Sequence, residues 1–228
     1  MKYSIVVPCY NEEKNIVSLV SELEIIQKAY DIEFIIVDNG SRDGTREILH
    51  SVCDNKTNFK IAEVEVNQGY GYGILQGLKA STGDFVGWIH ADMQIRPVEI
   101  LRAIDIIKRE TGHKSYVKGE RCNRSCAESF FTFFMGITAT LLLHQKMHDI
   151  NGIPVLFNRD LLTNFIKPPY DFALDTYSYY LAKKNGYGII RYPVVVEKRH
   201  EGRSSWNTGL ISKIKLAFTY IRDFKTIK

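Results

Sequence analysis

A regular alternation of strand-like and helix-like segments over the first hundred residues constrains this chain more than any other feature. Short runs rich in β-branched and aromatic residues are separated by longer runs in which apolar residues recur at helical spacing. We predict strands over 3–7, 33–37, 60–66 and 84–89, and helices over 11–29, 43–53, 73–80 and 97–108. Asn11 is expected to cap the first of these helices. This repeat predicts an α/β fold with a doubly wound, mostly parallel central sheet and helices on both faces.

The second half of the chain is less regular. Its patterns predict strands over 115–118, 153–157 and 189–196, and helices over 125–144, 172–184 and 209–224. With 228 residues and 45% hydrophobic content, the chain can bury one sizeable core. We therefore expect one domain over 1–206, followed by a basic amphipathic helix over 207–228.

Two segments raise the question of a membrane. The apolar run 130–143 is shorter than the ~20 residues that cross a bilayer, so we expect either a core helix or a helix in the membrane interface. The helix 207–228 is expected to dock on the protein itself, on another subunit, or on a membrane surface. Peripheral membrane contact is therefore an open alternative.

The charge and the cysteine content of the chain limit which partners and which cellular compartment are expected. The formal net charge is +4, and 197–228 holds eight Lys and Arg against three Asp and Glu. A basic end either keeps the chain soluble or faces an anionic neighbour. We expect no nucleic-acid binding, because no reading module accompanies the basic end. Four cysteines without a secretory signal pattern predict reduced thiols in the cytoplasm, with the cytoplasmic face of a membrane as the alternative.

Polar, acidic or glycine-rich segments follow each of the first four predicted strands. These segments are 8–12, 38–41, 67–71 and 90–94. In a doubly wound sheet the ligand binds at the carboxyl ends of the strands, so the four segments are expected to form one shared site. The glycines of 69–73 let backbone approach a ligand closely or simply form a tight turn. They do not form a dinucleotide fingerprint, because they follow the third strand with the wrong final spacing.

The segment His90-Ala91-Asp92-Met93-Gln94 is the central chemical feature. A carboxylate and a carboxamide two residues apart, just past a strand end, can aim two oxygens at one cation. Oxygen ligands favour Mg²⁺ or Mn²⁺, and a diphosphate would complete the coordination shell. Such a metal would neutralise charge developing on a leaving diphosphate. The alternative is an ordinary surface loop.

The ordered set of motifs resembles family two glycosyltransferases of the GT-A fold, and in particular the polyprenyl-phosphate mannose and glucose synthases. The resemblance rests on 8–12, 36–45, 80–84 and 90–94, and it extends to 117–121 and 199–204. It covers roughly 3–206. It implies a nucleotide-sugar donor, a metal ion, a lipid-phosphate acceptor and inversion at the anomeric carbon.

The resemblance also implies roles for individual residues. Base and ribose would be held by Pro8, Tyr10 and Glu12, and the nucleotide pocket would be lined by Val37, Asp38 and Asn39. His90 and Ala91 would contact the nucleotide sugar, and Asp92 and Gln94 would bind the metal. Arg121 and Arg199 would contact the donor diphosphate, the acceptor phosphate, or both, since a planar guanidinium suits bidentate phosphate binding.

The chain departs from the family pattern at four places. Asn39 and His90 stand where the family usually has aspartate, 149–154 replaces a segment that usually carries arginine, and Ser205 replaces a lysine. The last two departures lie on the acceptor side, so three functions are weighed. The first is transfer to a polyprenyl phosphate, which needs no base. The others are transfer to a sugar hydroxyl with Asp175 or Asp149 as base, and binding of a nucleotide sugar without catalysis.

Overall fold

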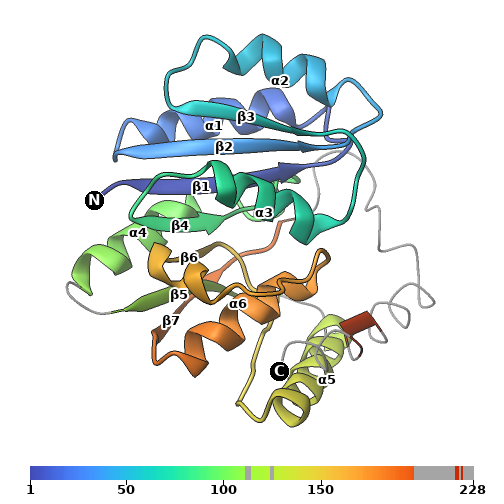
Figure 1. The fold of residues 1–228 in the computed structure, drawn as a ribbon, viewed down its shortest axis with the longest axis vertical. Helices are drawn as coiled ribbons and strands as arrows, with labels where there is room; N and C mark the ends of the chain where they lie inside the picture. Colours follow the sequence, from blue (N-terminus) through green and yellow to red (C-terminus); the bar gives the residue numbers. More distant parts are fainter. Residues whose placement is uncertain (111–113, 124–125, 198–218, 221, 223–228) are drawn as a thin grey trace.

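The chain folds around a single sheet flanked by helices, shown in Figure 1. A computed structural model describes residues 1–110, 114–123, 126–197, 219–220 and 222. The strands are β1 (Tyr3–Cys9), β2 (Ile32–Asn39), β3 (Phe59–Val64), β4 (Phe85–Trp88), β5 (Ser115–Arg121), β6 (Val155–Asn158) and β7 (Gly188–Val194). The helices are α1 (Ile16–Gln27), α2 (Thr45–Cys53), α3 (Tyr70–Ala80), α4 (Glu99–Arg109), α5 (Cys126–Leu143) and α6 (Ala173–Lys184), with a 3-10 helix over Arg159–Asn164.

The sheet has the strand order β3-β2-β1-β4-β6-β5-β7. β1 pairs in parallel with β2 and β4, and β5 pairs in parallel with β7. β6 lies between β4 and β5 and runs antiparallel to both. The prediction of a doubly wound, mostly parallel sheet is confirmed. Because β6 is reversed, its first residues lie at the edge where β1, β2, β4 and β5 end, called the carboxyl edge below.

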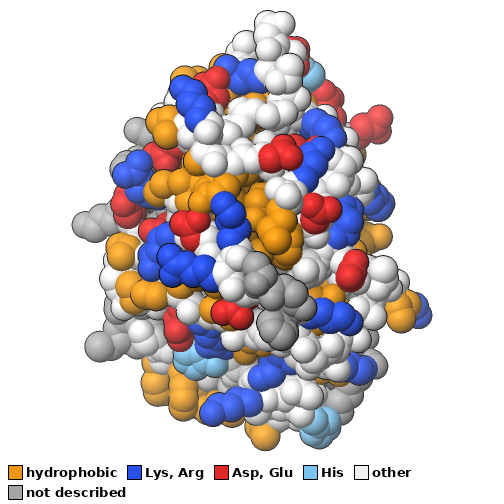
Figure 2. Space-filling view, turned by 90° about the vertical axis from the view of Figure 1, so that its left-hand side faces the viewer, with side chains coloured by type: hydrophobic (Ala, Val, Ile, Leu, Met, Phe, Trp, Pro, Cys, Tyr) orange, Lys and Arg blue, Asp and Glu red, His pale blue; other side chains and the backbone are white. Residues whose placement is uncertain are grey.

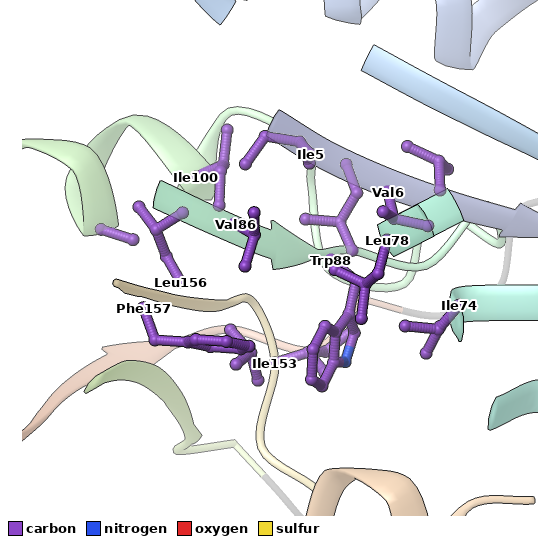
Figure 3. Close-up of a cluster of buried hydrophobic side chains, with 14 of the residues drawn as sticks. Ile5, Val6, Ile74, Leu78, Val86, Trp88, Ile100, Ile153, Leu156 and Phe157 are labelled. Atoms are coloured by element: carbon purple, nitrogen blue, oxygen red, sulfur yellow. The ribbon is translucent and has the colours of Figure 1, made fainter. Parts of the chain in front are cut away.

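Helices cover both faces of the sheet, as predicted. On one face α1 and α4 are linked by an ion pair of Arg96 with Glu22 at 2.9 Å and by a hydrogen bond from Tyr30 to Asp105. On the other face α3 lies beside the segment that leads into α6, since the N–H of Tyr72 donates to the carbonyl of Tyr170 at 3.0 Å. Figure 3 shows side chains of α4, the strands and α3 meeting in one apolar core.

Two boundaries differ from the prediction in ways that matter for the site. Asn11 was expected to cap the first helix, but α1 begins at Ile16. Asn11 instead adopts a positive φ of 55°, and its Oδ1 accepts the N–H of Arg42 at 2.8 Å, which ties the loop after β1 to the loop after β2. α3 begins at Tyr70 rather than at 73, directly after Gly69 with φ of 117°. Of the expected helix 209–224, 209–218, 221 and 223–224 lie outside the described residues, as does the boundary at 206.

The opposite edge of the sheet, where β1, β2 and β4 begin, is held by a buried carboxylate. Figure 2 looks onto this edge, where acidic and basic side chains are mixed around exposed hydrophobic ones. Glu33 accepts hydrogen bonds from Ser4 at 2.6 Å and from the Thr82 hydroxyl at 2.8 Å, and it pairs with Lys60 at 2.9 Å. Burial alone would raise the pKa of Glu33, but these donors outweigh burial and lower its pKa to about 2.

Glu33 should therefore make folding stability depend on pH. A depressed pKa stabilises the fold above the unfolded value near 4.5, and this contribution is lost as the pH falls toward about 2. We expect Glu33→Gln to lower the free energy of unfolding by roughly 2–3 kcal/mol at pH 7, with the difference narrowing below pH 4.5. Urea unfolding of both proteins between pH 3 and 7 measures this, with exposed Glu47→Gln as the control. Parallel pH profiles of wild type and Glu33→Gln would contradict the assignment.

Candidate active site

The segments predicted to share one site do meet at the carboxyl edge. β1 ends at Cys9, β2 at Asn39 and β4 at Trp88, and all three run parallel in adjacent positions. β5 ends at Arg121 on the far side of β6 and points the same way. The loops after these strands therefore carry the predicted site residues to one end of the sheet.

A pocket of ≈ 380 Å³ opens between the loops that follow β1, β2 and β3. Tyr10 lines it, and it is the predicted nucleotide-binding residue whose side chain forms part of the wall. The other lining residues are Gly40, Ser41, Arg42, Glu65, Val66 and Asn67. The sequence patterns singled out 67–71 as a loop but not Glu65 or Val66, which lie one and two residues beyond the end of β3. The size and the aromatic wall suit a flat, polar ligand such as a nucleobase.

The predicted nucleotide-binding residues Asp38 and Asn39 do not line the pocket but hold the loops around it. Asp38 is buried, where it accepts the Nε of Arg46 at 2.7 Å and the N–H of Ser41 at 3.0 Å. Asn39 is also buried and donates from Nδ2 to the carbonyl of Gly69 at 2.9 Å. The structure thus uses these two side chains to fix the loop after β2 and the start of α3.

Pro8 and Val37 lie in the strands β1 and β2 that lead to the pocket, and Glu12 follows β1. Val37 is fully buried in the core, and Pro8 is the half-buried penultimate residue of β1. Glu12 accepts the Nδ2 of Asn15 at 2.6 Å, and its own N–H donates to the Thr45 hydroxyl at 2.8 Å. These contacts join the segment after β1 to the first turns of α1 and α2.

The loop after β4 forms a tight turn around Asp92. Met93 has a positive φ of 58°, and the N–H of Gln94 donates to Oδ1 of Asp92 at 3.2 Å. Asp92 is 9% exposed, and Gln94 donates weakly to the carbonyl of Glu197 at 3.5 Å. Ala91 is buried beneath the turn. The turn therefore fixes the Asp92 carboxylate through the backbone of Gln94, while the Gln94 carboxamide reaches the carbonyl of Glu197.

Asp92 and Gln94 fit a divalent cation only if the ligand supplies further oxygens. Among the described residues, no three His, Cys, Asp or Glu side chains gather as a metal-binding group. Mg²⁺ and Mn²⁺ are commonly held by one or two protein oxygens together with phosphate oxygens and water. The donor set is thus compatible with a metal that binds together with a diphosphate.

His90 is oriented by a buried hydrogen-bond chain. Its Nε2 lies 2.8 Å from the hydroxyl of Tyr70, whose ring stacks on Phe172 with centroids 4.7 Å apart. Asp175 accepts the indole N–H of Trp88 at 2.8 Å and also interacts with the Tyr70 hydroxyl. The Tyr70 hydroxyl therefore links the His90 ring to Asp175 and holds that ring in one orientation.

The same chain carries strongly shifted pKa values. Burial raises the pKa of Asp175, although hydrogen bonds from Trp88 and Tyr70 and the charge of Lys118 oppose the rise. Burial also raises the pKa of Tyr70, and the carboxylates of Asp175 and Asp92 add to that rise. Tyr70 therefore lies within the electrostatic reach of both acids, which places the Asp92 turn and α6 around one centre.

Arg121 sits at the end of β5 in a second cluster of charges. It pairs with Asp149 at 2.8 Å, and its backbone N–H donates to the same carboxylate at 3.1 Å. Its Nε is buried and has no hydrogen-bond acceptor within the part of the chain that the structure describes. A buried guanidinium N–H without an acceptor is costly, and a phosphate oxygen would relieve that cost.

Lys118, which the sequence patterns did not single out, lies beneath Arg121 in the sheet. It is 1% exposed, and its Nζ donates to the carbonyl of Asp149 at 2.7 Å. Burial lowers the pKa of Lys118 to about 7. Burial would raise the pKa of Asp149, but the charges of Arg121 and Lys118 lower it. The signal that could have revealed this cluster is a lysine directly after Tyr116 and Val117 within a predicted strand.

The two carboxylates considered as general bases, Asp175 and Asp149, already have hydrogen-bond or ion-pair partners within the protein. Asp175 is 2% exposed and bonded to Trp88 and Tyr70, and Asp149 is held by Arg121. A general base must reach the acceptor oxygen and hold a proton near working pH. Burial of Asp175 and the lowered pKa of Asp149 favour structural roles for both.

One side chain from the end of the chain enters this region. Tyr220 is buried, accepts the Nδ2 of Asn151 at 2.6 Å and donates to the carbonyl of Phe172 at 3.2 Å. The apolar spacing of 209–224 did not include it. Arg199, predicted to contact phosphate, lies outside the described residues.

The sheet order and the loops at the carboxyl edge define the GT-A fold of glycosyltransferases. The structure aligns with glucosyl-3-phosphoglycerate synthase from Mycobacterium tuberculosis in complex with Mn²⁺, UDP-glucose and phosphoglyceric acid, with a TM-score of 0.76 and 18% identity over 100% of this chain and 80% of that one. A second complex of that enzyme, with Mn²⁺, UDP and glucosyl-3-phosphoglycerate, gives a TM-score of 0.73 and 19% identity over 100% and 81%. At these identities the likeness shows the fold.

The chain belongs to glycosyl transferase family 2, whose family model matches residues 4–164. Curated relatives include the undecaprenyl-phosphate 4-deoxy-4-formamido-L-arabinose transferase of Aeromonas hydrophila subsp. hydrophila, 29% identical over 154 residues, or 66% of this chain and 44% of the relative. The enzyme of that name from Pseudomonas aeruginosa is 34% identical over 106 residues, or 45% and 31%. The chain thus spans less than half the length of these relatives. The predicted resemblance to family two glycosyltransferases is confirmed.

The Tyr70 hydroxyl offers a direct test of the chain that orients His90. We expect Tyr70→Phe to lower sugar transfer about tenfold, equivalent to roughly 1.4 kcal/mol, because His90 loses the hydrogen bond that orients its ring. ¹⁵N NMR of labelled histidine should show a shifted Nε2 resonance for His90. Tyr72→Phe is the matched control, since Tyr72 lies in the same helix and packs edge-on against Tyr170. An unchanged His90 spectrum in Tyr70→Phe would refute the chain.

Proposed function

We propose that this protein transfers a sugar from a nucleoside diphosphate to a polyprenyl phosphate, with inversion at the anomeric carbon. The observation that carries the proposal is the Arg121 guanidinium, which lies at the same sheet edge as the Asp92 turn and whose buried Nε has no acceptor among the described residues. One cationic group for a phosphate and one oxygen-rich turn for a diphosphate suit a reaction between two phosphorylated substrates. The names of the curated relatives, which are undecaprenyl-phosphate sugar transferases, support the acceptor.

The donor nucleoside is assigned to the pocket beside Tyr10. The Tyr10 ring would pack on the base, while Pro8, Glu12, Val37, Asp38 and Asn39 would hold the surrounding loops in place. His90 and Ala91 would then lie beside the sugar diphosphate, with the His90 ring orientation set by Tyr70. The aligned synthase was crystallised with UDP-glucose, which supports a nucleotide-sugar donor for this chain.

Asp92 and Gln94 would hold Mg²⁺ or Mn²⁺ together with the donor diphosphate. When bound, the ion would neutralise the charge that develops on the leaving nucleoside diphosphate. The chain's own part is to keep the Asp92 carboxylate in place through the Gln94 N–H, in a turn that is 9% exposed at Asp92. Partial exclusion of water strengthens each electrostatic contact made there.

Arg121 and Arg199 would bind the acceptor phosphate and stabilise the charge passing to the diphosphate. An acceptor phosphate oxygen would form the bond to the anomeric carbon while the bond from that carbon to the diphosphate oxygen breaks. The phosphate oxygen is already ionised, so no side chain has to remove a proton. This agrees with the hydrogen bond that Asp175 accepts from Trp88 and with the ion pair of Asp149 and Arg121, which engage both possible bases.

A polyprenyl phosphate lies in a membrane, so the proposal places the protein at the cytoplasmic face of a bilayer as a peripheral protein. Among the described helices, none is both long and apolar enough to cross a membrane. Polyprenyl chains would remain in the lipid while the phosphate reaches Arg121 at the carboxyl edge.

Substitution of Asp92 tests the metal assignment. We expect Asp92→Asn to lower transfer at least a hundredfold and to abolish Mn²⁺-dependent binding of the nucleoside diphosphate in calorimetry, because the neutral amide attracts the ion weakly. The donor for this assay is selected by thermal shift with UDP-, GDP- and dTDP-sugars, with and without Mn²⁺. Asp160→Asn, an exposed acid outside the site, is the control. Transfer by Asp92→Asn at the wild-type rate would contradict the assignment of Asp92 as a metal ligand.

The acceptor is tested with undecaprenyl phosphate as sole acceptor. We expect product with undecaprenyl phosphate alone, and Arg121→Lys to raise the KM for that acceptor about tenfold, because the bidentate guanidinium is lost. Transfer that occurs only with a sugar hydroxyl acceptor would favour the base-dependent alternative. Donor binding without any transfer would favour a nucleotide-sugar binder.

A further inference from the structure

Helix α5 presents an apolar face away from the protein. Its exposed hydrophobic side chains recur at three- and four-residue steps, which places them on one side of the helix. They are Phe130 at 65% exposure, Phe133 at 59%, Phe134 at 49%, Ile137 at 39% and Leu141 at 68%, and together they are called the α5 face. Phe130 and Phe134 pack on each other with ring centroids 4.5 Å apart. Single exposed apolar residues are ordinary, but a continuous stripe marks an interaction surface.

The opposite side of α5 is fixed to the protein. Met135, Ala139 and Leu143 are buried, and the hydroxyl of Thr140 accepts the N–H of Met147 at 2.9 Å. Figure 1 shows α5 below the sheet, at the end of the molecule away from α2. The exposed fractions of the α5 face show that this side of the helix is accessible. A helix attached along one side can approach a flat surface only with its axis parallel to that surface.

Basic side chains gather at the carboxyl end of α5. Lys146 is exposed in the segment that follows the helix, between the exposed imidazoles of His144 and His148. Lys183 joins them, since its Nζ donates to the carbonyl of Lys146 at 2.6 Å. An aromatic stripe bordered by cations matches the headgroup region of an anionic bilayer, where apolar groups enter the lipid and cations meet phosphates.

α5 is also close to the candidate site along the chain. α5 begins at Cys126, five residues after Arg121, and the chain returns from it to Asp149, the partner of Arg121. The chain therefore connects each end of α5 to one member of the Arg121–Asp149 pair. A bilayer in that place would bring lipid phosphates to the guanidinium.

We propose that the α5 face rests on the surface of an anionic lipid bilayer, with the helix axis parallel to the membrane plane. This inference deepens the proposed function and rests on it for the identity of the acceptor lipid. Phenylalanine and leucine side chains insert among the acyl chains, and the basic group at the end of α5 holds anionic headgroups. The contact is peripheral and weakens with rising salt.

Vesicle co-sedimentation tests the proposal on the full chain. We expect Phe130→Asp/Leu141→Asp to lose at least tenfold in binding to vesicles of phosphatidylglycerol and phosphatidylethanolamine. The matched control is Val17→Asp/Ile25→Asp, which changes two comparably exposed residues, 55% and 67%, on α1. The control should bind as wild type does, and wild type should bind neutral phosphatidylcholine vesicles more weakly. A milder variant, Phe133→Ser, should lie between wild type and the double variant.

Two results would overturn the proposal. The first is wild-type vesicle binding by both α5 variants. The second is a wild-type dimer in sedimentation velocity without vesicles that the double variant converts to a monomer, since the face would then be a contact between copies. Transfer to a short, water-soluble polyprenyl phosphate separates this test from the proposed function. The double variant should retain that activity, and its absence in wild type would refute the acceptor while leaving the vesicle result intact.

Discussion

Strand β6 runs antiparallel between β4 and β5, and this insertion determines which residues reach the carboxyl edge of the sheet. Val155 pairs with Trp88 on one side and with Lys118 on the other. The strands approach closely, because a Cβ at Gly87 would collide with the carbonyl of Val155. With β6 reversed, the segment that precedes it lies beside the ends of β4 and β5. Asp149 and Asn151 therefore enter the site from a part of the chain that a wholly parallel sheet would send elsewhere.

The insertion also explains how the sheet tolerates a buried lysine. An isolated ammonium inside a protein is unstable, and it persists where charges and carbonyls compensate it. Lys118 meets the carbonyls of Asp149 and Ile150, at 2.7 Å and 3.3 Å, and the charge of the Asp149 carboxylate. Asp149 in turn holds Arg121, so its negative charge is committed to two cations. An acceptor that arrives as an anion finds a cationic surface there, which supports a phosphate rather than a hydroxyl.

The proposed donor half of the site follows from local sequence patterns, and the proposed acceptor half does not. The first four strands and the turn at Asp92 lie within a few residues of their predicted places, because strand periodicity and loop composition are local signals. Asn11 was assigned wrongly, since a capping side chain also suits the positive φ that it adopts between two loops. Tyr70 and Asp175 are far apart in the chain and meet through packing of α3 on α6. No spacing rule connects such residues.

The proposed acceptor half is formed by one stretch of the chain whose two ends are joined by an ion pair. Residues 122–148 leave the sheet at Arg121, pass through α5 and return at Asp149, where the two ends are joined at 2.8 Å. Thr140 and Met147 fasten the middle of α5 to the returning segment. The proposed lipid contact on α5 and the proposed phosphate ligand Arg121 thus belong to the same stretch of the chain. The loops proposed to bind the donor follow β1 to β4, on the other side of β6 from Arg121.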